Sequence, residues 1–239
     1  MRHWLANCDN ETHTCRPAAV RGSSSANAST RVPTRLIDVC KDGENMVRLV
    51  KTGPNETAAE WMALSHQWGS KPHFFTTTQN INDHLAGMDL EKLPPTFKDA
   101  VLVTRALGQR YLWIDSLCII QGQGGDFQNE VKRMEEVYSG AYCVIAASRS
   151  TGHFSGFLQK RNTRDHIALR REDESDAPFY IAQAIDNFKE HVLDGELNRR
   201  GWVLQEHALG RRTIFFTEHQ TYWECGHGVR CETMTTLSK

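Results

Sequence analysis

Residues 93–121 read LPPTFKDAVLVTRALGQRYLWIDSLCIIQ, and this stretch decides the fold class. Its first half has a broad apolar face at helical spacing, and Gly108 is a typical residue for ending such a helix. Thr96, with Asp99 three residues later, predicts a variant of the capping box at the helix start. Residues 111–120 are nearly all apolar, which is typical of a strand buried on both faces. A helix followed by such a strand predicts an α/β protein with a parallel sheet.

The segments on both sides repeat this rhythm. We expect strands at residues 61–65 and 142–147, a weak helix at 80–85 and a stronger helix at 127–138. Strands that alternate with helices imply right-handed crossovers and parallel pairing. The GQGG segment at 122–125 is expected to be a loop, and it lacks the spacing of a phosphate-binding loop.

The last third of the chain has a different pattern. Residues 165–170 and 179–184 are expected to be the arms of one hairpin, and residues 212–216 and 221–225 those of a second. Residues 198–209 are expected to form a helix between them. The predicted fold class is α/β, with a mainly parallel sheet flanked by helices and with β-hairpins added in the C-terminal third.

The N-terminal segment differs in composition from the rest of the chain. Residues 21–30, RGSSSANAST, are rich in serine and alanine and are typical of a flexible linker. We therefore expect two parts: an N-terminal Cys/His segment with its linker, residues 1–32, and a continuously folded domain, residues 33–239.

Composition narrows the classes of function. The 239 residues include 28 Lys and Arg against 29 Asp and Glu, which gives a net charge of -1, and no block of like charge occurs. This balance predicts neither a nucleic-acid partner nor a membrane surface. No stretch has the length of a transmembrane helix, and the N-terminus lacks the apolar core of a signal peptide. Seven scattered cysteines indicate a reducing compartment, so we expect a cytoplasmic protein with mostly free thiols.

Cysteine and histidine gather near both ends of the chain. The first group is His3, Cys8, His13 and Cys15, and the second is Cys225, His227 and Cys231. A zinc-stabilised interaction domain is one reading of these groups. However, the chain has no Cys-x-x-Cys pair, and the spacing matches no standard zinc finger. We therefore expect no metal site and expect the thiols to be packed as small apolar groups.

Candidate site residues follow the first two strands of the expected sheet. Ser65, Trp68 and Gly69 lie at or after the end of the first strand, and Asp115 lies in the apolar run of the second. Ligands of open parallel sheets bind outside the carboxyl ends of the strands. A carboxylate in an apolar strand is costly unless it is hydrogen-bonded or used, so Asp115 is either a structural or a functional residue. Trp68 is either a core residue or a platform on which a ring stacks.

A third segment, RGWVLQE at residues 200–206, carries a further carboxylate. If this segment is helical, Trp202 and Glu206 are four residues apart and share a face. Arg199 and Arg200 stand directly before them. Spacing alone favours an ordinary solvated carboxylate for Glu206.

Several motifs occur in the order found in one family. The segments are ALSHQWG at 63–69, the stretch at 93–121, EVKRMEEVYSGAYCVIAAS at 130–148, RGWVLQE at 200–206 and YWEC at 222–225. Together they closely resemble the HET domain, the heterokaryon-incompatibility domain of filamentous fungi. The opening WLANC…HTC resembles the lead-in that is common before such domains. The chain departs from the family at His66, where many members have Tyr, and at the GQGG loop, where members often have acidic residues.

The resemblance implies a role in non-self recognition that ends in programmed cell death. The HET domain is the death-inducing effector and is distantly similar to the TIR domain, which implies a TIR-like, flavodoxin-like fold. Many TIR domains cleave NAD with a glutamate in a Trp-x-x-x-Glu arrangement. WVLQE, from Trp202 to Glu206, matches that pattern. The resemblance therefore makes Glu206 the leading catalytic candidate.

The implied reaction needs one carboxylate. Nicotinamide leaves NAD as a neutral ring, so no general acid is required, and the transition state resembles an oxocarbenium ion. A carboxylate that faces the developing cation stabilises that state more than the ground state. The remaining roles are then assigned as follows: Ser65, Trp68, Gly69 and Asp115 line the pocket, Trp202 packs under it, and Arg199 or Arg200 meets the pyrophosphate.

The resemblance also implies partners. We expect NAD or a related nucleotide as substrate, no separate cofactor, self-association as the activating event, and an upstream recognition protein. The alternative is a non-enzymatic module that signals death by binding a partner.

Overall fold

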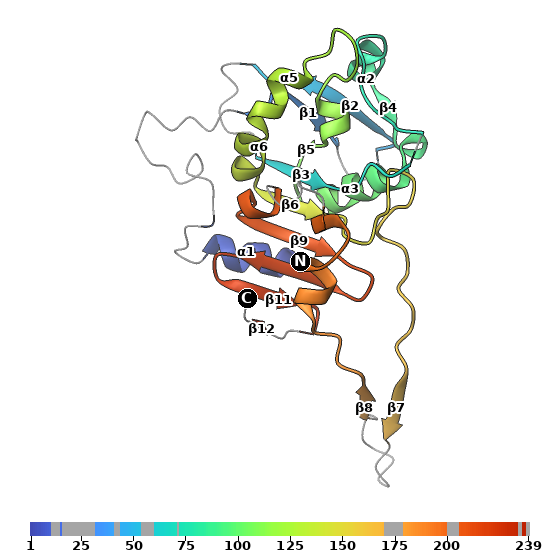
Figure 1. Ribbon diagram of the computed structural model, residues 1–239, viewed down its shortest axis with the longest axis vertical. Helices are drawn as coiled ribbons and strands as arrows, with labels where there is room; N and C mark the ends of the chain where they lie inside the picture. The colour runs from blue at the N-terminus through green and yellow to red at the C-terminus, as the bar shows by residue number, and fades with distance from the viewer. Residues whose placement is uncertain are drawn as a thin grey trace.

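The computed structural model of this chain shows one ten-stranded mixed sheet with helices packed around it (Figure 1). It describes residues 1–10, 15, 32–40, 44–53, 60–70, 72–169, 179–199, 206–233 and 236–237. Strand order across the large sheet is β12-β11-β10-β9-β6-β3-β5-β1-β2-β4. A separate two-stranded sheet pairs β7 with β8. None of the helices in these ranges is long and apolar enough to cross a membrane.

Four parallel strands form the centre of the sheet. They are β3 (Trp61–Ser65), β5 (Tyr111–Trp113), β6 (Cys143–Ala146) and β9 (Arg212–Phe216). Every residue of β3 and β6 is buried, as expected for strands covered on both faces. This confirms the predicted α/β domain with parallel strands at its centre.

Antiparallel strands extend both edges of this centre and make the sheet mixed. Beyond β5 lie β1 (Arg35–Asp38), β2 (Met46–Lys51) and β4 (Met88–Asp89). Beyond β9 lie β10 (Thr221–Cys225), β11 (Gly228–Cys231) and β12 (Thr236–Leu237). The predicted hairpins of the C-terminal third are confirmed as β9–β10 and as β7 (His166–Leu169) with β8 (Phe179–Ala182).

Helices connect the strands. The α-helices are α1 (Arg2–Asn10), α2 (Ile81–Ala86), α3 (Pro95–Ala106), α4 (Asp115–Cys118), α5 (Phe127–Glu130) and α6 (Met134–Gly140). Short turns of other helix types are η2 (Leu90–Lys92), η3 (Val131–Arg133), η4 (Lys189–Leu193) and η5 (Leu197–Arg199). From β3 the chain runs through α3 to β5, and from β5 it returns through α6 to β6 on the other side of β3. Right-handed crossovers in opposite directions place α3 and α6 on opposite faces of the sheet.

The strand predicted at residues 111–120 is too long. β5 ends at Trp113, and α4 begins at Asp115. The Cys118 N–H donates to the Ile114 carbonyl at 2.7 Å, so the chain turns directly after the strand. Leu117 and Cys118 are nonetheless 1% exposed, because the turn points them into the core. The apolar run therefore predicted the burial of these residues correctly but their strand conformation wrongly.

The capping box predicted for α3 is also wrong. The helix begins after Pro94 with Pro95 in its first turn, and Thr96 accepts no capping bond. Thr96 Oγ1 instead donates to the Gly152 carbonyl oxygen at 2.6 Å. The Asp99 carboxylate accepts from the Phe157 N–H at 2.6 Å. Both side chains therefore anchor the loop that follows β6.

The segment predicted as one helix at 198–209 differs in part. Leu197–Arg199 is the 3₁₀ turn η5, and residues 206–209 are helical. Residues 200–205 lie outside the described residues.

Helix α1 packs into the same core as the sheet. Trp4, Leu5 and Cys8 are buried, and the Trp4 and Trp223 rings lie 6.4 Å apart. The Tyr142 hydroxyl donates to Asp9 at 2.7 Å, which ties α1 to the start of β6. Figure 1 shows α1 beside the β9–β11 part of the sheet. The predicted division of the chain at residues 32 and 33 stays a prediction.

Candidate functional site

The parallel strands create one edge at which ligands bind in sheets of this class. From β3 the chain crosses toward β5, whereas from β6 it crosses to β9 on the opposite side. Adjacent strands whose connections leave in opposite directions form a crevice at their carboxyl ends. The candidate site therefore lies where the loops after β3 and β6 meet, beyond Ser65 and Ala146.

Two glycines let these loops cross each other. Gly69 follows β3 and has a φ of +73°, in the left-handed region that favours glycine. A Cβ on Gly69 would lie 2.7 Å from the Gly152 Cα and 2.7 Å from the Thr151 carbonyl oxygen. A Cβ on Gly152 would lie 2.9 Å from the Gly69 Cα. Close backbone packing accounts for Gly69, and its predicted contact with a ligand stays a prediction.

Asp115 and Trp68 lie side by side at this edge. Trp68 Nε1 donates to Asp115 Oδ2 at 2.8 Å, and the Ser116 N–H donates to Asp115 Oδ1 at 2.6 Å. His66 Nδ1 lies 3.9 Å from the same oxygen. Hydrogen bonds therefore account for a carboxylate next to an apolar strand, and the carboxylate holds the indole in one orientation.

Two histidines contact the indole of Trp68, and a third lies behind them. The centroids of the His73 and His153 rings lie 5.6 and 5.5 Å from that of Trp68, and His66 lies 5.2 Å from His153. Phe97, from α3, lies 4.6 Å from His153. Burial, and then the charge of His66, lower the pKa of His153 to about 4. His153 is therefore neutral near pH 7.

Glu206 is buried beside Tyr138. Glu206 is 7% exposed. The Tyr138 hydroxyl donates to the Leu64 carbonyl oxygen at 3.1 Å. Burial raises the pKa of Tyr138 well above its usual value, and the nearby charges of Glu206 and Asp115 raise it further, as does a hydrogen bond with Glu206. Glu206 and Asp115, the two predicted carboxylates, therefore both raise the pKa of this buried hydroxyl.

Ser65 lies across a small cavity from His207, the residue after Glu206. A small cavity with room for about one water, ≈ 10 Å³, is lined by Ser65 and by residues of the opposing segments, including Asn198 and His207. His207 directly follows Glu206, and its Nε2 lies 2.5 Å from Glu224. The end of β3 and the segment that carries Glu206 therefore pack against each other.

A larger pocket of about 320 Å³ opens at the crossing point of the loops. Its residues follow the ends of β3, β6 and β9, belong to η4, or directly precede η5: Gln67, Ser148, Arg149, Ser150, Thr151, Glu190, His191, Glu196, Thr217, Glu218 and His219. Such a volume is within the range of small-molecule sites. We call this the switch-point pocket. Glu196 lines it, and the next residue, Leu197, lines the small cavity, so the same segment borders both hollows.

Arg149 is the cation of the switch-point pocket. Its Nη1 donates to the Gln159 carbonyl oxygen at 2.8 Å, and its Nε lies 3.1 Å from Glu218. The His191 and His219 rings stack at 4.0 Å on another wall. Burial, and then His219, lower the pKa of His191. The pocket therefore combines one fixed guanidinium with two stacked imidazoles.

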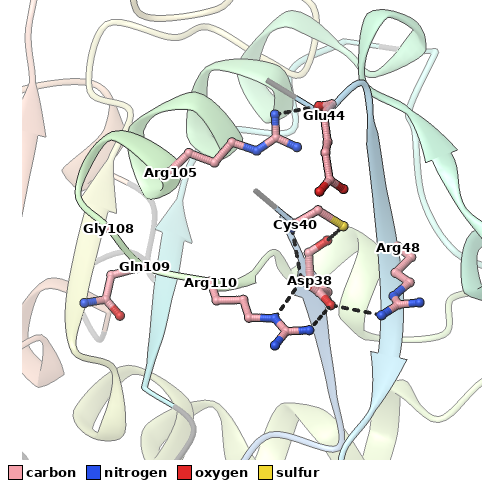
Figure 2. Close-up of a pocket in the computed structure, with 8 residues that line it drawn as sticks. All are labelled: Asp38, Cys40, Glu44, Arg48, Arg105, Gly108, Gln109 and Arg110. Carbon is pink, nitrogen blue, oxygen red and sulfur yellow. Dashed lines mark hydrogen bonds and ion pairs between the residues drawn. The ribbon is translucent and has the colours of Figure 1, made fainter. Parts of the chain in front are cut away.

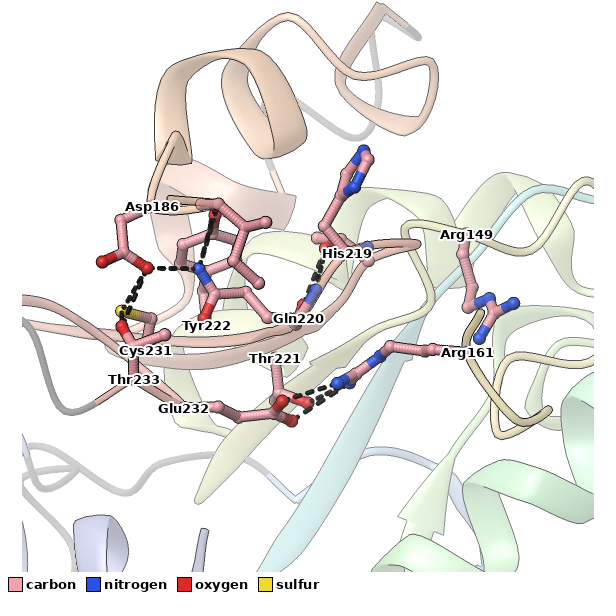
Figure 3. Close-up of polar contacts among 12 residues, drawn as sticks. Arg149, Arg161, Asp186, His219, Gln220, Thr221, Tyr222, Cys231, Glu232 and Thr233 are labelled. Atoms are coloured by element: carbon pink, nitrogen blue, oxygen red, sulfur yellow. Dashed lines mark hydrogen bonds and ion pairs between the residues drawn. The ribbon is translucent and has the colours of Figure 1, made fainter. Parts of the chain in front are cut away.

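A hydrogen-bond network behind the pocket fixes its β9–β10 wall (Figure 3). Gln220 Nε2 donates to Asp186 at 2.9 Å and to the Ile185 carbonyl oxygen at 3.1 Å. The Tyr222 hydroxyl donates to the same carbonyl oxygen and lies 2.7 Å from His191 Nδ1. The turn that carries Glu218 and His219 is therefore held from its buried side.

Three predicted site residues remain: Arg199, Arg200 and Trp202. Arg199 is exposed at the end of η5, three residues after Glu196 of the switch-point pocket. Arg200 and Trp202 lie outside the described residues. Sequence reasoning missed Arg149 and the two stacked histidines. The signal for Arg149 was its place after the β6 strand, SRS at 148–150, at the edge where ligands bind.

A still larger cavity, of about 500 Å³, lies at the opposite edge of the parallel strands (Figure 2). Asp38 at the end of β1 pairs there with Arg48 at 3.3 Å and Arg110 at 2.9 Å. Arg105 donates to three backbone carbonyl oxygens. These charged groups satisfy one another and the backbone at the amino edge, so we assign the candidate site to the carboxyl edge in spite of its smaller volume.

Fold and site together define an α/β domain whose candidate ligand site lies at the switch point of its parallel strands. The family model described as Heterokaryon incompatibility protein (HET) matches residues 61–206, which is more than half of the chain. The chain belongs to this family. The match begins at the first residue of β3 and ends at Glu206.

A curated relative supports the same family. Heterokaryon incompatibility protein 6, OR allele, from Neurospora crassa is 24% identical over 224 residues, covering 78% of this chain and 32% of the relative. The chain thus spans about a third of the relative's length. No solved structure matches the chain.

Proposed function

We propose that this domain is a death-inducing effector of fungal non-self recognition that cleaves NAD at the bond between nicotinamide and ribose. The observation that carries the proposal is the buried Glu206 carboxylate beside Tyr138, at the carboxyl edge of the parallel strands. Membership of the HET family and the name of the Neurospora relative support the biological role.

Strand order supports a TIR-like fold for this proposal. Numbered along the chain, the four parallel strands β3, β5, β6 and β9 stand in the order 2-1-3-4 across the sheet. Doubly wound sheets of the flavodoxin type begin with this order. Their ligands bind at the switch point, which here is the edge that carries Ser65 and the switch-point pocket.

Glu206 has the chemistry for the reaction. As nicotinamide leaves, positive charge develops on the ribose, and a fixed carboxylate stabilises that charge more than it stabilises the substrate. A site with little water strengthens this interaction because it lowers the local dielectric. The Tyr138 hydroxyl holds the carboxylate in position through its hydrogen bond. Water then adds to the ribose and gives ADP-ribose.

The neighbouring residues suit the rest of the substrate. Arg149 supplies a fixed guanidinium for the pyrophosphate, with Arg199 and Arg200 as further candidates. Trp68, whose indole is held by Asp115, is the candidate to stack against a ring, and Ser65 and Gly69 are the candidates to line the pocket beside it. Trp202, which lies outside the described residues, is proposed to pack under the pocket. NAD is the substrate, and the proposal requires no cofactor.

Activation by self-association, which the resemblance to TIR domains implies, agrees with the burial of Glu206. Because the residue is 7% exposed, the segments that cover it must move before a substrate can reach the carboxylate. In the proposal, an upstream recognition protein brings copies of the domain together in the cytoplasm, and their contacts stabilise the open form. Neither a nucleic acid nor a membrane takes part.

The test is direct. The purified domain is incubated with NAD at high concentration and with a crowding agent, and nicotinamide release is measured for the wild type and Glu206→Ala. Release by the wild type and not by the variant is the expected result. Absence of release under every oligomerising condition contradicts the enzymatic proposal, and equal release from both proteins contradicts the assignment of Glu206.

One observation favours a second function, a non-enzymatic interaction module. The β7–β8 hairpin projects away from the rest of the molecule (Figure 1). Ile167, Leu169, Tyr180 and Ile181 are between 49% and 64% exposed on it, and exposed apolar groups of this kind mark protein contacts. If binding alone triggers death, toxicity in fungal cells survives Glu206→Ala and is lost in an Ile167→Lys, Ile181→Lys double variant.

A further inference from the structure

Three cysteines from distant parts of the chain meet in the interior. The sulfur atoms of Cys8, Cys15 and Cys225 all lie within 4.8 Å of one another, and all three residues are buried. They are free thiols in the structure. Cys8 and Cys225 are 217 residues apart in the sequence, so this grouping is a product of the tertiary fold alone.

Each thiol is held by a different element. Cys8 lies on α1, Cys225 ends β10, and Cys15 is fixed against the turn between β10 and β11. A Cβ on Gly226, in that turn, would lie 3.1 Å from the Cys15 sulfur. Glycine at this position therefore leaves room for the thiol to approach Cys225.

The arrangement is close to the geometry of a thiolate zinc site. Zinc–sulfur bonds of about 2.3 Å in a tetrahedron separate the sulfurs by about 3.8 Å. The observed upper limit of 4.8 Å is within about 1 Å of this separation, which rotations of the three side chains cover. A group of thiolates selects zinc over hard cations such as magnesium and calcium.

Arg212 gives a second, independent indication of negative charge at this place. It is 1% exposed, and its Nε and Nη2 have no hydrogen-bond acceptor among the described residues. Its Nη1 lies 2.8 Å from Asp9. A buried N–H group without an acceptor is costly. The thiolate sulfurs of a metal site that includes Cys8 would accept hydrogen bonds from these N–H groups.

We propose that Cys8, Cys15 and Cys225 bind one zinc ion, which fastens the N-terminal helix α1 to the β10–β11 hairpin. The site is structural, because it joins two elements of the core and lies in the antiparallel extension of the sheet rather than at the switch point. It departs from the sequence prediction of no metal, which rested on the missing Cys-x-x-Cys spacing. Ligands contributed by both ends of a chain carry no such local spacing.

Zinc reaches the site from the surface. A cavity of about 470 Å³ is lined by Cys225, Gly226 and the neighbouring Glu224, so one ligand borders an open hollow. Binding releases the thiol protons, because zinc holds thiolates. His227, two residues after Cys225, is the candidate for the fourth ligand.

The proposal is tested on the full chain, purified without a polyhistidine tag and under a reducing agent. Elemental analysis is expected to give about one zinc per chain, as for other structural sites. Replacement of zinc by cobalt is expected to give the near-ultraviolet charge-transfer band of thiolate ligands. A zinc content below about 0.1 per chain after incubation with Zn²⁺, together with absence of the cobalt band, overturns the proposal.

Variants assign the ligands. Cys8→Ser, Cys15→Ser and Cys225→Ser are each expected to lower the zinc content at least about tenfold, because structural zinc sites use all of their ligands. Cys231→Ser is the matched control, since Cys231 is also buried on the same hairpin, in β11, and lies outside the cluster. Equal zinc loss in Cys231→Ser contradicts the ligand assignment. His227→Ala is expected to lower the zinc content as well, and an unchanged zinc content contradicts its assignment as the fourth ligand.

If a variant does not fold, the wild-type chain still tests the proposal. Removal of zinc from the wild-type chain with a strong chelator is expected to lower its Tm and to expose α1 to proteolysis. Readdition of Zn²⁺, but not of Mg²⁺, is expected to reverse both changes. A chain with one zinc per molecule whose Tm is unchanged by the chelator contradicts the structural role.

Discussion

The two edges of the parallel strands carry similar residues and use them differently. At the amino edge, Asp38 is 2% exposed at its side chain and is neutralised by Arg48 and Arg110. At the carboxyl edge, Glu206 is also buried, and the Tyr138 hydroxyl shares a hydrogen bond with it. The larger cavity lies at the amino edge and the loop crossing at the carboxyl edge.

This difference shows that volume and charge do not by themselves locate a site. A carboxylate paired with two arginines has already been given its counter-charge by the protein. In the proposed reaction, the carboxylate of Glu206 instead faces a positive charge that develops on the substrate. The two edges therefore predict opposite results for matched substitutions, in activity and in stability.

The largest effect is expected from Glu206→Gln. The amide keeps the shape and a hydrogen bond to Tyr138 but removes the charge, so NAD cleavage is expected to fall at least about 100-fold. The measurement is nicotinamide release at saturating NAD, with the thermal unfolding of both proteins as the control for folding. A rate within about threefold of wild type would show that the charge at the carboxyl edge is not used.

A pH effect on stability is expected from His153. Its pKa is lowered from 6.5 to about 4 by burial and His66, so the unfolded chain binds more protons than the folded chain between these values. Its contribution is complete above pH 6.5 and is lost as the pH falls toward 4, by on the order of 2–3 kcal/mol. Urea unfolding at several pH values measures this slope. His153→Gln should flatten the slope between pH 6.5 and 4, and an unchanged slope contradicts the assignment.

Asp38→Asn is the counterpart of Glu206→Gln at the amino edge. Burial alone would raise the pKa of Asp38, but hydrogen bonds from Arg110, the Cys40 N–H and Arg48 lower it. Its stabilising effect is therefore present above the unfolded pKa and is lost as the pH falls below that value. Because the arginines are largely exposed, the substitution is expected to lower the free energy of unfolding at pH 7 by about 1–2 kcal/mol.

The same variant should leave NAD cleavage unchanged. Denaturant unfolding and nicotinamide release are measured on one preparation, so that folding and activity are compared directly. A large loss of activity in Asp38→Asn, with the fold intact, would place the site at the amino edge and contradict the assignment made here to the carboxyl edge.

The smallest effect is expected from Tyr138→Phe. This substitution removes the hydroxyl that bonds the Leu64 carbonyl oxygen and positions Glu206. Loss of one such bond costs about 1 kcal/mol, which corresponds to about a fivefold lower kcat. KM should change little because the hydroxyl is buried. An effect on KM alone would show that Tyr138 contacts the substrate rather than positions the carboxylate.

Much of the fold could be predicted from sequence because burial is periodic. The runs at 61–65 and 142–147 and the helix of residues 93–108 were placed correctly, since strands covered on both faces and amphipathic helices leave local patterns. The short antiparallel strands β1, β2 and β4 were missed. These strands are brief, and β1 pairs with β5 and β2 with β4, partners that lie far along the chain.

The candidate site was predictable only in part. Ser65, Trp68 and Asp115 were expected to gather, because strand ends of a parallel sheet share an edge, and the structure brings Trp68 and Asp115 into direct contact. Arg149 was missed, although its place directly after the β6 strand, at the edge where ligands bind, was a signal for it. Whether Glu206 is catalytic stays a prediction that the variants above decide.

By itself, the sequence determined the α/β rhythm, the parallel centre of the sheet and membership of the HET family, because these depend on local periodicity and on motifs in order along the chain. The tertiary structure was needed to see which groups meet. These are the glycines Gly69 and Gly152 at the loop crossing and the thiols of Cys8, Cys15 and Cys225. The physical reason is that the crossing and the thiol cluster each join segments from distant parts of the chain. No spacing within one segment records which distant segment will pack against it.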